Sequence, residues 1–313
     1  MNGDLKHRGR LSQLFIYLGK FLRMFVYQSD WKVIPMGAII AGVVTFVVGQ
    51  NMFVTQEGTL MGVFALVCVC IWNGFFNSIQ VVCRERSIIK REHRAGLHMS
   101  AYIGAQMVYQ FLLCAGQTVV TLLIFRFAGV KLPDKGIVTM SGLADLGISI
   151  FLITYTSDML ALLVSCIVRT TTNAMTVMPF LLIFQMIFSG SFFELNGPAE
   201  KLKVITISHW GMDSMCAVGR YNECSNVTLW NTLFKFRNVE FMGEKPLLEL
   251  MREVERKNAV GDFISWSGTY NRVEDYASTY ANVTQCWIWL LALMAFFALV
   301  AVIALEFVDR DKR

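Results

Sequence analysis

The residues best able to form ionic contacts with a partner lie in one short stretch, positions 84–96. Five Arg and Lys residues and two Glu residues fall there, between two long apolar runs. Glutamate and basic side chains at helical offsets pair with each other, and the remaining charges are free to bind a partner surface. The members of this charged cluster that we expect to make such contacts are Arg84, Glu85, Arg86, Lys90, Arg91, Glu92, Arg94 and Gly96.

One further ionisable residue lies in the middle of an apolar run. Asp158 directly follows Tyr155, Thr156 and Ser157, and no other charged residue occurs between positions 146 and 168. A carboxylate is costly inside a bilayer and is treated there as functional by default. Two interpretations stay open: a proton-relay or cation site, and a polar contact with an Asn or Gln of a neighbouring span.

Cysteine and histidine spacing predicts neither a metal site nor catalytic residues. Cys68 and Cys70 are separated by a single valine, which is too tight and too apolar for zinc. No His, Ser or acidic set shares one face of an apolar run, so we expect no enzyme. Cys216 and Cys224 form a possible disulfide in an oxidising compartment, with Cys286 as a third candidate.

Long apolar runs must position these groups. The chain has 313 residues, of which 55% are hydrophobic and only 16% are charged, and the apolar residues are concentrated in blocks. This pattern excludes an ordinary soluble domain and predicts an all-α protein that crosses a membrane several times. Six runs are expected to span the bilayer: residues 33–48, 60–82, 100–127, 143–168, 174–193 and 286–305.

Basic residues set the orientation of these spans. The charged cluster lies between the second and third spans, and residues 309–313 follow the last one. The loop at 50–58 has no Lys or Arg, so it lies outside by the positive-inside rule. Both termini are therefore expected in the cytoplasm of a multi-pass protein of the cell membrane. The net charge of +5 lies beside the spans and indicates membrane lipid, not nucleic acid, as the partner of these side chains.

Four regions follow from this topology. Residues 1–30 are expected to form a cytoplasmic tail and an amphipathic helix in the membrane interface, because leucines and phenylalanines recur there at helical spacing. Residues 31–195 carry spans one to five, with the charged helical connection at 84–100. Residues 196–285 form a long extracellular segment with a re-entrant part, and residues 286–313 carry span six and a cytoplasmic tail.

Two groups of residues, in register on this topology, resemble a known family. The first is Glu85-Arg86, Lys90-Arg91-Glu92 and Gly96 between spans two and three; the second runs from Phe188 to Phe193 and continues at Ile207–Asp213 and Arg220–Glu223. They are similar to the membrane domain of G-type ABC exporters. This group comprises the White and pleiotropic-drug-resistance transporters and their bacterial relatives, and its membrane domain is a type-2 ABC permease. A bacterial origin is expected because no ATPase is fused to this sequence.

The resemblance implies a role for each group. The charged cluster would be the coupling helix that contacts an ATPase; the alternative is a topology determinant bound to anionic headgroups. Aromatic and amide residues of spans two and five would line the substrate cavity, although helix packing is the commoner use of such residues: Trp72, Asn73, Phe76, Asn77, Phe180 and Phe184. Ser191, Phe192 and Phe193 would form the outer gate, or else interfacial aromatics.

The sequence lacks a phosphate-binding G-x-x-x-x-G-K-[ST] motif. The chain itself is therefore expected to bind no cofactor. ATP and Mg would be bound by a separate ABC ATP-binding subunit or domain. A second copy of the permease would complete the cavity. The expected function is export of an amphipathic or lipophilic solute by alternating access. The alternatives are export of a lipid-linked glycan or a peptide, and a non-transporting membrane scaffold that recruits a cytoplasmic partner.

Overall fold

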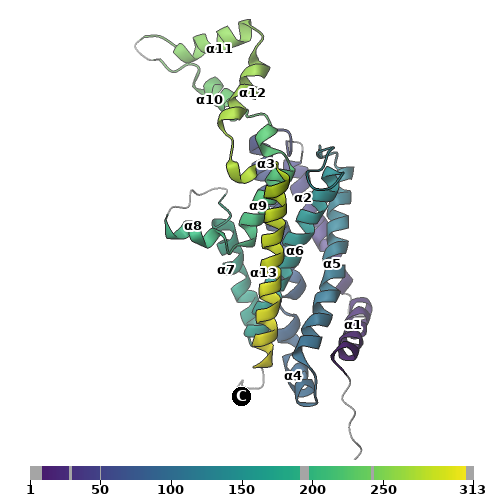
Figure 1. Cartoon of the computed structure of the whole chain (residues 1–313). Helices are drawn as coiled ribbons and strands as arrows, with labels where there is room; N and C mark the ends of the chain where they lie inside the picture. The colour runs from purple at the N-terminus through teal and green to yellow at the C-terminus, as the bar shows by residue number, and fades with distance from the viewer. Residues whose placement is uncertain (1–8, 28–29, 50, 191–196, 241–242, 308–313) are drawn as a thin grey trace, which may run out of the picture.

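The computed structural model describes residues 9–27, 30–49, 51–190, 197–240 and 243–307. Within these ranges the chain is all helical, and its only β-type pairing is an isolated bridge between Thr55 and Ser225. The all-α class predicted from the sequence is confirmed. Figure 1 shows a long upright bundle with a separate group of short helices at one end.

The bundle is built from apolar helices that can cross a bilayer. Four of the described stretches are long and apolar enough: Gln56–Arg94, Met99–Phe127, Gly142–Ile167 and Tyr280–Glu306. The first of these contains two helices, α3 (Gln56–Ser78) and α4 (Val81–Arg94); the others are α5, α6 and α13. Two shorter apolar helices, α2 (Val33–Val48) and α7 (Thr171–Ile187), occupy the positions predicted for spans one and five. The multi-pass membrane fold is therefore confirmed.

Several predicted helix ends are wrong by a few residues. The charged helix α4 begins at Val81, ends at Arg94 and is followed by a turn, whereas 84–100 was predicted. The last span, α13, begins at Tyr280 and not at Cys286, because the Thr279 side chain caps it by accepting a hydrogen bond from the Asn282 amide. Span five is shorter than predicted, since α7 ends at Ile187.

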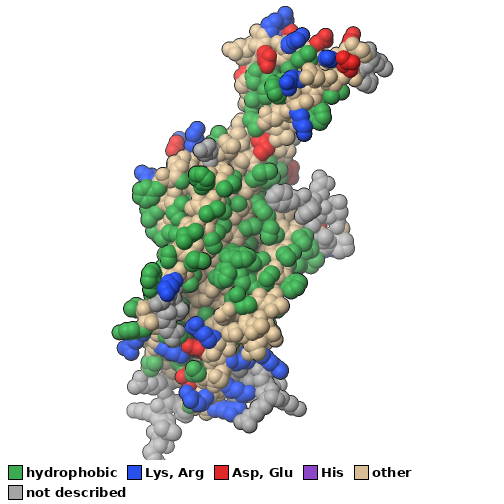
Figure 2. Space-filling model, turned by 180° about the vertical axis from the view of Figure 1, so that it is seen from behind, with side chains coloured by type: hydrophobic (Ala, Val, Ile, Leu, Met, Phe, Trp, Pro, Cys, Tyr) green, Lys and Arg blue, Asp and Glu red, His purple; other side chains and the backbone are tan. Residues whose placement is uncertain are grey.

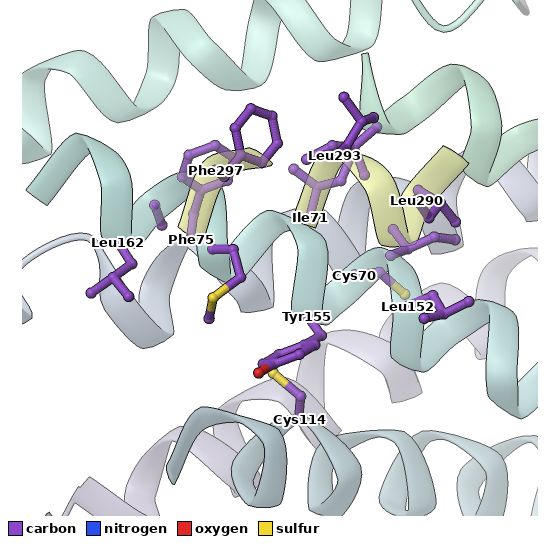
Figure 3. Close-up of a cluster of buried hydrophobic side chains, with 14 of the residues drawn as sticks. Cys70, Ile71, Phe75, Cys114, Leu152, Tyr155, Leu162, Leu290, Leu293 and Phe297 are labelled. Carbon is purple, nitrogen blue, oxygen red and sulfur yellow. The ribbon is translucent and has the colours of Figure 1, made fainter. Parts of the chain in front are cut away.

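Helix α6 is the centre of the bundle and packs against α3, α5, α13 and the short helix α9 (Ile207–Val218). The contact with α3 is close because of Gly74, where a Cβ atom would lie 2.4 Å from the backbone oxygen of Thr154. Apolar side chains gain little free energy when they move from lipid acyl chains to a helix interface. Helices in a membrane therefore usually pack through small residues that let their backbones come close together. Figure 3 shows the apolar side chains of this core, including Phe75 of α3, Leu162 of α6 and Phe297 of α13.

The predicted amphipathic helix is present as α1 (Arg10–Tyr27), which packs along α5. Its apolar side faces the bundle, with Phe21 buried against Tyr102 and Tyr109 of α5. Leu11, Phe15 and other large apolar side chains of α1 stay exposed, as expected for a helix that lies in a membrane interface.

The segment between spans five and six has two parts. The first contains α8 (Pro198–Lys203) and α9 (Ile207–Val218), and every residue of α9 is buried against α3, α6 and α13. The second contains α10 (Thr228–Phe236), α11 (Pro246–Arg256) and α12 (Val260–Tyr270), which project beyond the bundle in Figure 1. Cys216 and Cys224 are free thiols in the structure, so the disulfide that the sequence allowed is not formed in it.

Candidate functional site at the charged end of the bundle

The start of α4 is held to the end of α6 by hydrogen bonds between side chains and backbone groups. The first amides of a helix lack partners within it. Here the Ser165 hydroxyl accepts hydrogen bonds from the Val82 and Cys83 amides at 3.0 and 3.2 Å. The Cys83 thiol in turn donates to the carbonyl oxygens of Ser165 and Val168 at 3.1 and 3.2 Å. The beginning of α4 therefore moves with span four.

Arg86 adds a charged contact to the same place. Its guanidinium donates to the carbonyl oxygens of Cys166 at 2.8 Å and Val168 at 3.2 Å. These are carbonyls at the end of α6, where unpaired oxygens carry the negative end of the helix dipole. Arg86 is thus a link between two helices of the chain.

The other side of α4 is held by α1. Lys20 forms an ion pair with Glu85 at 3.1 Å, and the Tyr17 hydroxyl donates to Glu92 Oε2 at 2.5 Å. The Gln13 side chain donates to the Gly96 carbonyl at 3.1 Å and accepts from the His98 amide at 3.0 Å. Three residues of α1, one turn apart, therefore connect it to the whole length of α4 and to the turn that follows.

Burial strengthens these contacts. Glu85 is only 7% exposed, so its charge depends on Lys20 for compensation. The pKa of Tyr17 is raised above its ordinary value, first by burial and then by the hydrogen bond to Glu92, because an ionised phenol beside a carboxylate is unfavourable. The phenol accordingly remains a hydrogen-bond donor at neutral pH.

The predicted cluster is divided by this arrangement. Glu85, Arg86 and Glu92 make contacts within the chain, whereas Arg84, Arg91 and Arg94 are exposed. Lys90 is half-buried, and Gly96 adopts a φ of 100° that favours glycine at the turn into α5. Figure 2 shows Lys and Arg side chains gathered at this end of the molecule, below a broad apolar surface.

Sequence reasoning missed the residues that hold α4. Gln13, Tyr17 and Lys20 lie at a spacing of three to four residues on one side of α1, which is a detectable signal for a polar face. Nothing in the sequence indicates that their partners are 65 to 85 positions away. Ser165 carries no such signal.

The predicted intramembrane residue Asp158 lies in a second polar cluster. It is fully buried, and its Oδ2 faces the Cys114 thiol at 3.8 Å. Its Oδ1 has no hydrogen-bond partner in the part of the chain that the structure describes. Cys114 is not the Asn or Gln that one of the two interpretations expected.

Two amides beside it pair with each other. Asn77 of α3 and Gln117 of α5 exchange hydrogen bonds of 3.0 and 3.1 Å, and Gln110 donates to the Ser78 hydroxyl at 2.9 Å. In lipid such pairs hold helices together, since their polar groups find no water. The cluster joins spans two, three and four.

The residues predicted to line a substrate cavity fall into two sets. Asn73 and Asn77 are buried, the first against Gly37 of α2 and the second against Gln117. The aromatic residues lie on the outer surface: Trp72 is 40% exposed, Phe76 43%, Phe180 70% and Phe184 38%. The predicted outer gate, Ser191, Phe192 and Phe193, lies outside the described residues.

Comparison with known proteins agrees with this fold. The sequence profile described as ABC-2 type transporter matches residues 14–210, which include most of α1, the charged α4 and the beginning of α9. The chain therefore belongs to the ABC-2 type transporter family. It is also similar to the "ABC transporter ATP-binding/permease protein Rv1747" of Mycobacterium tuberculosis, with 26% identity over 151 residues. The match covers 47% of this chain and 17% of that relative, so the chain spans only a small part of the relative's length.

Proposed function

We propose that this chain is the permease subunit of an ABC exporter and that α4 transmits movement from an ATP-binding partner to the spans. The observation that carries the proposal is the double attachment of α4, through Ser165 and Arg86 to α6 and through Tyr17 and Lys20 to α1. A helix held in this way transfers a force on its exposed side to two other helices. Family membership supports the class of transporter.

The exposed side of α4 is suited to a protein partner. It carries Ser87, Ile88, Arg91 and Arg94, a mixture of basic, polar and apolar groups. Arginine offers planar, multiple hydrogen bonds to carboxylates of a partner surface. ATP and Mg would be bound by that partner, whose closure on ATP would press on α4.

The substrate would be amphipathic or lipophilic and would leave through a cavity between two copies of the chain. The exposed aromatics of α3 and α7, among them Trp72 and Phe180, form an apolar surface that a second copy would cover. Apolar and aromatic surface with a few polar groups is what binding of such molecules requires.

The test is reconstitution of the full chain with its ATP-binding partner in lipid vesicles. Arg91→Glu combined with Arg94→Glu reverses two exposed charges of α4, and it should abolish both partner binding and transport-linked ATP hydrolysis. Arg252→Glu, an equally exposed arginine on α11, is the matched control and should change neither. If the reversed variant still binds and is stimulated, α4 is not the contact. If the intact chain recruits a partner but no solute moves, the protein is a scaffold.

A further inference from the structure

Three neighbouring hollows in the surface are all bordered by Tyr109 of α5, and two of them are also lined by α4. The largest, here called the headgroup hollow, has a volume of about 200 Å³ and lies between α2, α3, α4, α5 and α7. Its polar side chains are Asn77, Gln80, Arg84 and Gln110. It therefore opens at the end of the bundle where the basic residues gather.

The second, here called the acyl hollow, is almost purely apolar. It has a volume of about 150 Å³ and lies between α1, α2 and α5. Besides Tyr109 it is lined by Leu22, Phe25, Ile34, Leu112 and Leu113. Leu113 and Tyr109 border both hollows, so the apolar hollow lies next to the polar one.

The charge at this junction is positive. Arg84 lines the headgroup hollow and the third, smaller hollow, and its guanidinium makes no hydrogen bond or ion pair with the described residues, whereas its backbone amide donates to the Gln80 carbonyl at 2.9 Å. Among the described residues, Glu85 is the only carboxylate that borders these hollows, and Lys20 pairs with it at 3.1 Å. Asn77 and Gln110 direct their amide groups to Gln117 and Ser78, which leaves the Arg84 guanidinium as the charged donor for a ligand.

We propose that these joined hollows bind one anionic phospholipid of the cytoplasmic leaflet, with its phosphate on Arg84 and one acyl chain between α1, α2 and α5. An arginine at the end of a span, above an apolar slot, matches the shape and polarity of such a molecule. The bound lipid contacts α1, α4 and α5 at once and so reinforces the attachment of α4. The lipid then occupies Arg84 near the beginning of α4, whereas Arg91 and Arg94 near the end of the helix are left for the protein partner.

This inference rests on the hollows and their charge and does not depend on the proposed transport. It is tested by native mass spectrometry of the full chain, stripped of lipid and titrated with palmitoyl-oleoyl-phosphatidylglycerol. Phosphatidylcholine with the same acyl chains tests the charge, and inorganic phosphate tests whether the acyl chain is needed. Arg84→Gln removes the charge, and Leu113→Trp fills the space between the hollows. Arg23→Gln is the matched control, because Arg23 is an exposed arginine of α1 that lines none of the hollows.

One phosphatidylglycerol should be retained, about fivefold more tightly than phosphatidylcholine, since one basic side chain near a membrane surface contributes roughly that factor. Arg84→Gln should remove this preference, Leu113→Trp should weaken both lipids, and Arg23→Gln should change nothing. If Arg84→Gln and Arg23→Gln reduce the retention of phosphatidylglycerol equally, the site is overturned, because the lipid is then held only by the general positive charge of the surface. Displacement of the lipid by inorganic phosphate, or equal retention of both lipids, would also overturn it.

Discussion

The attachment of α4 to α1 is tested most directly at the hydrogen bond between Tyr17 and Glu92. This bond joins α1 to the last turn of α4 at 2.5 Å, and the phenol is the donor. Tyr17→Phe removes the hydroxyl and leaves the ring in place beside Phe21 and Tyr102. The substitution therefore isolates the hydrogen bond from the packing.

The expected cost follows from the type of bond. Hydrogen bonds to charged groups contribute about 1.5 to 3 kcal/mol, and solvent screening of the two half-buried partners lowers this one below that range, to about 1 kcal/mol. A double-mutant cycle of Tyr17→Phe and Glu92→Met, in which each substitution alone removes the hydrogen bond, should give a coupling energy of about 1 kcal/mol from thermal unfolding in detergent. Strictly additive effects of the two substitutions would refute the attachment.

The pH dependence has a defined sign. The pKa of Tyr17 is raised above its ordinary value of 10.0, so the folded protein holds this proton more tightly than the unfolded chain does. The stabilisation is therefore complete below about pH 10 and is lost only as the pH rises through the raised pKa. The difference in stability between wild type and Tyr17→Phe should stay constant from about pH 7 to about pH 9. A decline over that range would contradict the assigned environment.

Three further substitutions test other contacts by thermal unfolding. Lys20→Met should lower the free energy of unfolding by about 1 to 2 kcal/mol, because it leaves the buried Glu85 carboxylate uncompensated. Adding Glu85→Gln to the same chain should restore part of this stability. If it restores none, the two residues do not pair. Gly74→Ala should cost at least about 2 kcal/mol, since its Cβ would lie 2.4 Å from the backbone of α6, and a neutral result would show that α3 and α6 are farther apart. Asn77→Leu should cost about 0.6 kcal/mol, and it should lose this effect when Gln117 is also Leu; an unchanged cost would show that the two amides do not pair.

The elements of this fold could be predicted because the bilayer requires long apolar helices and tolerates few alternatives. The range predicted for the first span, residues 33–48, coincides with α2, and the charged helix was placed within three residues of its start. Helix ends were less certain because side-chain caps such as Thr279 decide them.

The attachment of α4 could not be predicted, because it depends on which sides of distant helices meet. The charged cluster shows in the sequence that basic groups gather, but not that Arg86 points to α6, Arg84 to a hollow and Arg91 to the exterior. Asn73 and Asn77 illustrate the same limit. An asparagine can line a cavity or join two packed helices, and the sequence does not distinguish these uses. The contacts of Asn73 with Gly37 and of Asn77 with Gln117 show that both lie inside the bundle.

The central claim, that α4 contacts an ATP-binding partner, is tested most directly by site-specific photo-crosslinking. A photoreactive residue replaces Ser87 on the exposed side of α4 in the full chain in native membranes, and Glu255 on α11 serves as the control position. The account predicts an adduct from Ser87 alone with a protein that carries a phosphate-binding loop and binds ATP. An adduct of equal yield from Glu255, or no ATP-binding adduct from Ser87, would contradict it.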